Sequence, residues 1–83
     1  MNDEQVRGIK KMYPSGTKIK LVYMNDKQAV PSGTIGTVDY VDDIGTIFMK
    51  WENGSTLGLI YGVDKFEKVK EGERRYERES ILY

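Results

Sequence analysis

The dipeptide Asn53-Gly54 is the strongest local signal in this sequence of 83 residues. It lies between residues 47–51 and 57–60, two stretches in which apolar side chains recur with the spacing of β-strands. Asn-Gly is the favoured centre of a tight hairpin turn, because both positions tolerate a positive φ. The sequence therefore predicts an antiparallel hairpin here, and a β-sheet as the framework of the fold.

Three further segments are predicted to be strands. Residues 18–23 carry apolar side chains at every odd position, which is the pattern of a half-buried strand. Residues 34–41 follow as a second strand, with Ile35 and Val38 expected in the core, and residues 66–69 as a short last strand. Gly36 inside the second strand indicates a bend or a bulge.

The connections between these strands differ in length. Residues 25–33 form a polar loop that is long for a hairpin. Residues 42–45 have the composition of a tight turn, in which Gly45 is expected to take a positive φ. Residues 61–64 are predicted to be a one-turn connector.

Residues 3–13 are predicted to be a short helix. Asn2 or Asp3 serves as the N-cap, and Pro14 ends the helix because the residue before a proline is pushed out of helical geometry. One narrow apolar stripe runs along it, made of Val6, Ile9 and Tyr13. A helix of this length is not stable alone, so it must pack on the sheet.

These elements predict a mainly β fold, a small five-stranded SH3-like barrel at residues 14–70. The helix occupies residues 1–13, and a charged C-terminal tail residues 71–83. An OB-fold is the alternative architecture. It usually carries a helix between its third and fourth strands, where this sequence has a tight turn.

The composition limits what can stabilise this domain and where it works. The chain has no cysteine, so disulfides and thiolate-bound zinc are excluded and a compact apolar core must hold the fold. No stretch approaches the roughly 20 apolar residues of a membrane helix, and the acidic start does not resemble a secretory signal. We therefore expect one cytoplasmic domain without a membrane partner.

The charge balance argues against nucleic acid as the main ligand. The 13 basic and 13 acidic residues cancel, whereas proteins that bind duplex nucleic acid usually carry a basic excess.

Catalysis is also disfavoured. Neither histidine nor cysteine is present, which removes the side chains best suited to proton transfer and thiolate nucleophiles near neutral pH. Asp39, Asp42 and Asp43 could hold a hard cation such as Mg²⁺, but a solvated turn explains them better. The chain is therefore predicted not to be an enzyme and to need neither a cofactor nor a metal.

The tyrosines are the conspicuous surplus, six in all. Trp51, Phe66 and Tyr23 are expected to fill the barrel, which leaves several other tyrosines for the surface. Exposed tyrosines serve interfaces, stack on bases or surround cations. The candidate binding residues are Tyr40, Asp42, Asp43, Tyr61, Arg74, Arg75 and Tyr76. The expected face combines the 25–33 loop, the 42–45 turn and the 61–64 connector.

Several segments together carry a family resemblance. They are Tyr13-Pro14-Ser15-Gly16-Thr17, the stretch 30–38 (VPSGTIGTV), the stretch 41–47 (VDDIGTI), Trp51-Glu52-Asn53-Gly54-Ser55 and the stretch 59–66 (LIYGVDKF). In these the chain resembles an uncharacterised domain family of phages and mobile elements of Gram-positive bacteria. Where that family has proline, this chain has Tyr61. The resemblance implies no catalytic residue, and the Trp-Glu-Asn-Gly stretch is also similar to the hairpin of SH3-like modules.

The leading functional hypothesis is a non-enzymatic binding module of a phage or mobile element, with a protein partner or a second copy of itself. The alternative is an anti-defence protein that blocks a host immune effector or sequesters its nucleotide signal. In that case a small nucleotide would bind between subunits, held by tyrosine rings and by Lys18, Lys20, Arg74, Arg75 or Arg78. A nucleic-acid-binding barrel is the third hypothesis, with affinity that falls steeply with salt.

Overall fold

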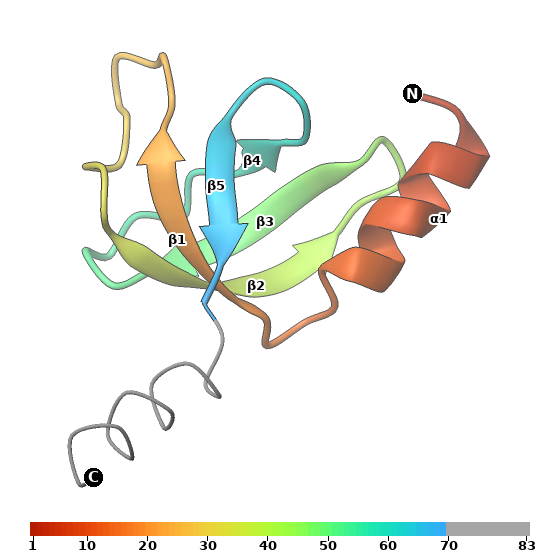
Figure 1. Ribbon diagram of the computed structural model, residues 1–83, viewed down its shortest axis with the longest axis horizontal. Helices are drawn as coiled ribbons and strands as arrows, with labels where there is room; N and C mark the ends of the chain where they lie inside the picture. The colour runs from red at the N-terminus through yellow and green to blue at the C-terminus, as the bar shows by residue number, and fades with distance from the viewer. Residues whose placement is uncertain (70–83) are drawn as a thin grey trace, which may run out of the picture.

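The computed structural model describes residues 1–69 of the chain. The predicted tail, residues 71–83, and Lys70 before it lie outside the described residues. One helix and five strands follow one another in the order α1 Asp3–Met12, β1 Lys18–Tyr23, β2 Ile35–Val41, β3 Thr46–Trp51, β4 Leu59–Ile60 and β5 Lys65–Lys68 (Figure 1).

The five strands form one antiparallel sheet in the order β4-β3-β2-β1-β5, so the prediction of a mainly β fold with a short helix is confirmed. β4 and β5 are the two edges, and they are not paired with each other within residues 1–69. The sheet is therefore open, and the predicted barrel is not closed. One reason is that β4 has only two residues, which is too little backbone for a second ladder.

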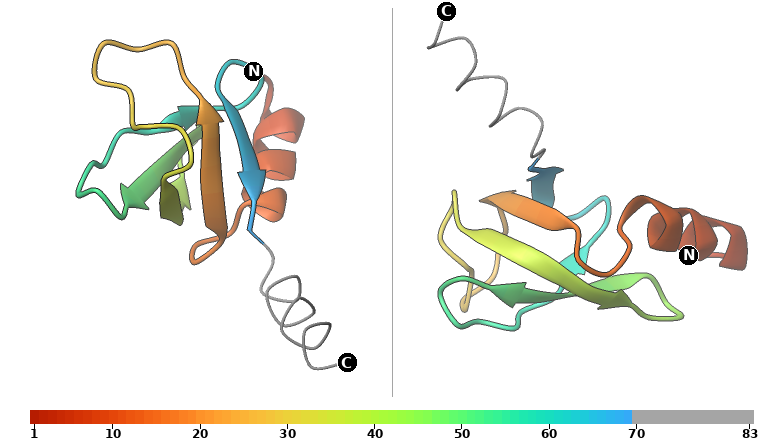
Figure 2. Two further views of the ribbon diagram at one scale, coloured as in Figure 1. Left: turned by 60° about the vertical axis from the view of Figure 1, so that its left-hand side comes forward. Right: turned by 90° about the horizontal axis from the view of Figure 1, so that it is seen from below.

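The sheet curls around a single apolar core (Figure 2). β1 and β5 lie on one side of this core and β3 on the other, with β2 passing between them. The predicted alternation is confirmed in β1 and β3, whose inward side chains are buried. These are Ile19, Leu21, Ile47, Met49 and Trp51, joined by Val38 and Leu59. The Trp51 indole N–H donates to the Leu57 carbonyl at 2.8 Å, so burying the ring leaves no polar group unsatisfied.

Tyr23 does not fill the core as predicted. The pairing of β1 with β5 shifts in register between Leu21 and Tyr23, which rotates the end of β1 and leaves Tyr23 55% exposed. Met24 is buried instead, with its sulfur accepting from the Val30 N–H at 3.4 Å. Phe66, also predicted in the core, is only partly buried and packs against its edge.

Ile35 does not lie in the core as predicted, and Gly36 does not mark a bulge. Val38 faces the core, and because side chains alternate along a strand, Gly36 faces it too while Ile35 is only half-buried on the other side. Gly36 is opposite Trp51 in the β2–β3 pair. A Cβ atom at Gly36 would lie 2.5 Å from Trp51 Cε3. The glycine therefore makes room for the indole ring, and the register shift in β2 falls later, between Val38 and Tyr40.

The hairpin after β3 differs from the predicted two-residue turn. Only Gly54 has a positive φ, of 90°, and Asn53 does not. The Gly54 N–H donates to Trp51 O at 2.9 Å, and the Trp51 N–H donates to Ser55 O at 2.9 Å. This pattern is typical of a type I turn followed by a glycine bulge. Asn53 contributes through its side chain, which accepts from the Ser55 N–H at 3.0 Å.

The same four-residue turn precedes both β1 and β2. Pro14-Ser15-Gly16-Thr17 and Pro31-Ser32-Gly33-Thr34 each close with the threonine hydroxyl donating to the proline carbonyl at 2.6 Å. The glycine N–H of each turn donates to the neighbouring strand, Gly16 to Val38 O and Gly33 to Leu21 O. β1 and β2 therefore each begin after the same type of turn.

α1 is the predicted helix, ending one residue earlier than expected. Asn2 is its N-cap and forms a capping box, in which Asn2 Oδ1 accepts from the Gln5 N–H and Gln5 Oε1 accepts from the Asn2 N–H. Val6 and Ile9 are its buried residues. Within residues 1–69, no helical segment combines the length and apolarity of a membrane span.

Candidate functional site

A groove between α1 and the connector (residues 61–64) is the strongest candidate for a binding site. Gln5, Gly8 and Met12 are three and four residues apart and so line one face of the helix, and Met1, which precedes the N-cap, also lines the groove. We call these four residues the α1 stripe. Ile9 and Tyr61 complete the lining, and the groove has a volume of about 240 Å³.

Gly8 keeps the middle of this groove open. It lies in the interior of α1, where glycine is less favourable than alanine by about 0.5–1 kcal/mol. Its φ is not positive, and within residues 1–69 no atom beyond its chain neighbours and the surrounding helix backbone lies within 4 Å of the position that a Cβ would take. The fold described here therefore does not require glycine at this position, in contrast to Gly36. The side-chain-free backbone instead exposes the floor of the groove.

Tyr61 forms the opposite wall because the connector is tightly fixed. The Asp64 carboxylate accepts from the Ile60 N–H at 2.8 Å, and the Asp64 N–H donates to Ile60 O at 3.0 Å. The connector is thus the single turn that the sequence predicted. Tyr61 remains 44% exposed.

Two further aromatic rings, those of Tyr13 and Phe66, support this wall. Tyr13 lies 6.2 Å from Tyr61 and 5.5 Å from Phe66 between ring centroids, and Tyr61 lies 6.5 Å from Phe66. The Lys68 ammonium lies over the Tyr13 ring, 5.2 Å from its centroid. The cluster joins the end of α1, the connector and β5, and so links the two walls of the groove.

Tyr13 should make the stability of the fold sensitive to alkaline pH. Burial, and to a lesser extent the nearby Tyr61 phenol, raise the pKa of Tyr13 above its ordinary value of 10.0. The neutral phenol is therefore favoured in the folded state. Its contribution is complete below pH 10 and is lost as the pH rises through the folded-state pKa, because the unfolded chain releases the proton first.

We expect the unfolding free energy to decline above pH 10, and a Tyr13→Phe variant to decline less steeply. Urea titrations at a series of pH values measure both slopes. Tyr23→Phe is the matched control, because it alters an exposed tyrosine outside the aromatic cluster. Equal slopes for wild type and Tyr13→Phe would show that the Tyr13 phenol does not cause the decline.

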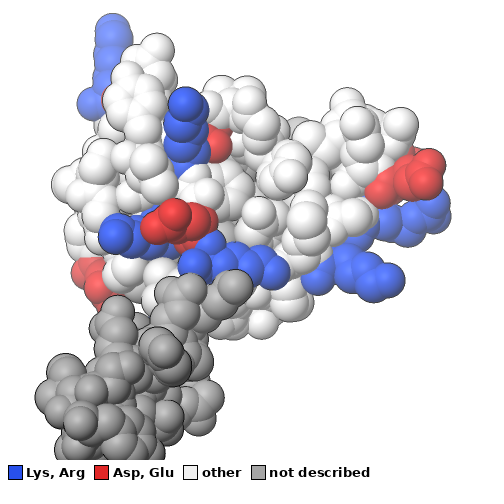
Figure 3. Space-filling view, viewed as in Figure 1, with Lys and Arg blue, Asp and Glu red and all other residues white. Residues whose placement is uncertain are grey.

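Exposed apolar side chains gather at the same end of the molecule. Among residues 1–69, nine large apolar residues are exposed, and six of them come from the N-terminus, α1, the β2–β3 turn, β4 and the connector. These six are Met1, Met12, Ile44, Ile60, Tyr61 and Val63. Ile44 and Val63 are the most exposed, at 74% and 72%. The surface between the connector and α1 carries few charged atoms (Figure 3). Exposed apolar residues that cluster in this way often mark an interaction surface, whereas singly scattered ones do not.

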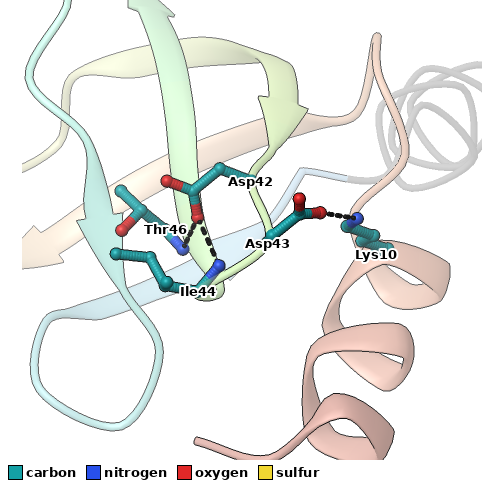
Figure 4. Close-up of polar contacts among 5 residues, drawn as sticks. All are labelled: Lys10, Asp42, Asp43, Ile44 and Thr46. Carbon is teal, nitrogen blue, oxygen red and sulfur yellow. Dashed lines mark hydrogen bonds and ion pairs between the residues drawn. The ribbon is translucent and has the colours of Figure 1, made fainter.

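The predicted acidic residues of the β2–β3 turn have structural roles. Asp42 Oδ1 accepts from the N–H groups of Ile44 and Thr46, at 3.1 and 2.9 Å (Figure 4). Asp43 forms an ion pair with Lys10 of α1 at 3.0 Å. Gly45 has the predicted positive φ, of 90°. The turn therefore positions Ile44 beside the helix.

In the described part of the chain, no group of three His, Cys, Asp or Glu side chains is arranged to hold a metal.

The other predicted site residues do not join this groove. Tyr40 stacks on Phe48 across β2 and β3, with ring centroids 4.8 Å apart, and lines a separate pocket with Tyr13 and Lys10. The 25–33 loop precedes β2 and the 42–45 turn follows it, so the two lie at opposite ends of that strand (Figure 1). The predicted combined face is therefore wrong in this part. Arg74, Arg75 and Tyr76 lie outside the described residues.

The α1 stripe is not evident from the sequence, because Gln5 and Gly8 do not belong to the apolar pattern of the helix. The available signal was a glycine inside a capped helix, flanked by Gln5 and Met12 at helical spacing.

Comparison with known proteins matches this chain to a family of domains. A family model described as Domain of unknown function (DUF4314) matches residues 2–69, which include α1 and all five strands. No curated protein and no solved structure matches the chain. Because the description names no activity, function has to be argued from the geometry of the groove.

Proposed function

We propose that this chain, which belongs to the DUF4314 family of domains of unknown function, is a non-enzymatic module that binds a protein partner in the groove between α1 and the connector. The groove itself is the observation that carries the proposal. It has apolar walls, an aromatic side chain on one of them, and a glycine that leaves its middle open.

The side chains around the groove suit a protein partner. Tyrosine is enriched among the residues that dominate binding energy, and Tyr61 combines partial exposure with a fixed backbone. Met1 and Met12 are unbranched and adapt to the shape of a bound side chain. Ile44 and Val63 extend the apolar surface beyond the groove.

The finer assignments of fold and origin belong to the same proposal. The strand order β4-β3-β2-β1-β5 and the hairpin after Trp51 support placing the open sheet in the SH3-like class. The resemblance to domains of phages and mobile elements supports an origin in such an element. In the anti-defence form of the proposal, the partner is a host immune effector.

Removal of the Tyr61 ring tests the proposal. Peptides selected on the wild-type protein from a displayed library would be titrated against wild type and Tyr61→Ala by fluorescence anisotropy. We expect Tyr61→Ala to weaken binding by at least tenfold, because loss of a central aromatic anchor typically costs about 2 kcal/mol or more.

Tyr23→Ala is the control, since Tyr23 is also exposed but lies at the end of β1 outside the groove. It should bind the selected peptides as wild type does. Equal affinities for wild type and Tyr61→Ala would show that the peptides bind elsewhere, and the proposal would be abandoned.

A further inference from the structure

We infer that the partner in the groove is a second copy of this chain, bound through its own α1 stripe with the two helices antiparallel. The inference rests on the proposed function and names its partner. It follows from three properties of α1: the spacing of the stripe, the small residue at its centre, and the distribution of charge along its flank.

The stripe has the spacing of a helix–helix contact. Positions 5, 8 and 12 are three and four residues apart, which is the spacing of residues that face a partner helix. Val6 and Ile9, which pack on the sheet of the same chain, lie on a neighbouring face. α1 can therefore contact its own sheet and a second helix at the same time. It lies at one end of the molecule in both further views, where a second copy can approach it (Figure 2).

Gly8 lies at the centre of the pairing. Without a side chain, it allows two helix backbones to approach closely. In an antiparallel pair related by a two-fold axis near Gly8, Met12 of one copy packs beside Gln5 and Met1 of the other. The six exposed apolar residues around the groove extend this contact on both sides.

Charge complementarity selects the antiparallel orientation. Glu4 and Lys11 are seven residues apart, so both lie on the same flank of the stripe, and both are exposed. In antiparallel helices the same flanks meet, which places Glu4 of one copy beside Lys11 of the other, twice. In a parallel pair the acidic first turns, Asp3 and Glu4, would lie side by side. In Figure 3, acidic atoms at this end of the molecule lie next to basic atoms.

The dimer should be weak. Two helices of ten residues bury less than the roughly 1,200 Å² of a standard stable interface. We therefore expect dissociation constants on the order of 10–100 μM, near the weak end of the affinity scale. Sedimentation equilibrium over a concentration series up to the millimolar range would detect such a dimer in the full chain.

Single cysteines test the contact and its orientation, since the chain contains no other thiol. Gly8→Cys should form a disulfide dimer under mild oxidation, because the two Cα atoms approach within the roughly 7 Å that a disulfide requires. The control is Ser32→Cys, an exposed position in the turn before β2. A mixture of Gln5→Cys and Met12→Cys should give the heterodimer faster than either variant alone gives its homodimer. Fast homodimer formation by Gln5→Cys would indicate parallel helices and overturn the inference.

Charge reversal tests the flank without touching the groove. Glu4→Lys and Lys11→Glu should each weaken the dimer several-fold, because each places like charges in contact twice. A mixture of the two variants should recover association. Lys27→Glu is the control, because Lys27 is exposed in the 25–33 loop, outside α1. Equal effects of all three substitutions would overturn the inference.

The outcomes separate this inference from the proposed function. A chain that stays monomeric to millimolar concentration, with Gly8→Cys no faster than Ser32→Cys, overturns the inference. If its selected peptides still require Tyr61, the proposed function stands with a different partner. If they do not, both are wrong.

Discussion

Gly36→Ala is expected to lower the free energy of unfolding by about 2–3 kcal/mol, near the upper part of the usual range for overpacking a core. The added methyl would lie 2.5 Å and 2.9 Å from two atoms of the Trp51 ring and 3.0 Å from Met49 Cε. The ring cannot move away freely, because it is buried and its N–H is bonded to Leu57 O. Such a loss is a large fraction of the stability of a domain of this size. The fluorescence of the single tryptophan during urea unfolding measures it.

The Trp51 ring can be tested as the cause of this effect. In a Trp51→Phe background the ring is smaller, so Gly36→Ala should cost at least about 1 kcal/mol less, a coupling typical of residues in contact. Circular dichroism replaces fluorescence for these variants. An equal cost in both backgrounds would show that backbone preference, and not the indole, makes glycine necessary at position 36.

The alternation of apolar and polar residues predicted the buried side chains correctly wherever the strand ladder is regular. It correctly assigned Ile19 and Leu21 in β1 and all three inward residues of β3, because strand geometry alone determines which face a side chain takes. It failed at Tyr23, where the ladder shifts in register. A shift of this kind depends on pairing with a distant segment, here β5, and has no local signature.

A glycine can serve a turn or make room for a neighbouring side chain, and the sequence alone does not distinguish these roles. Gly45 and Gly54 have the positive φ expected of turns, but Gly36 is a space for a ring that lies 15 positions later in the chain. Closure of the barrel could not be predicted from the sequence either, since it depends on whether a two-residue β4 can pair with β5. These are properties of the assembled core.

The candidate site was partly predictable. Tyr61 was identified as a surplus aromatic beside a connector, and it lies in the wall of the groove. Asp42 and Asp43 were correctly located in a turn, but they hold that turn and its ion pair with α1. Tyr40 was separated from the groove because β2 carries it on another face. The α1 stripe was not predicted, because its central residue, Gly8, has no side chain and so does not contribute to an apolar pattern.

Gly8 should separate stability from binding. Gly8→Ala is expected to raise the free energy of unfolding by about 0.5–1 kcal/mol, because alanine is the better helix former and its methyl group meets open space. Stability changes of 1 kcal/mol shift the melting temperature of a domain of this size by about 4–8 °C, so a gain of several degrees is expected by circular dichroism. A loss of stability would show that the glycine has a structural role after all.

Gly8→Leu should stabilise the helix nearly as much, since leucine and alanine have similar helix propensities, and should abolish binding in the groove. Its side chain would occupy the space that the glycine leaves between Met12, Gln5 and Tyr61. We expect at least a hundredfold loss of affinity for peptides that require Tyr61, measured by anisotropy, together with an unchanged or higher melting temperature. Most substitutions that destroy binding also lower stability, so this combination would be difficult to explain unless the glycine is retained for the groove. A Gly8→Leu protein that binds these peptides as tightly as wild type would place the site elsewhere.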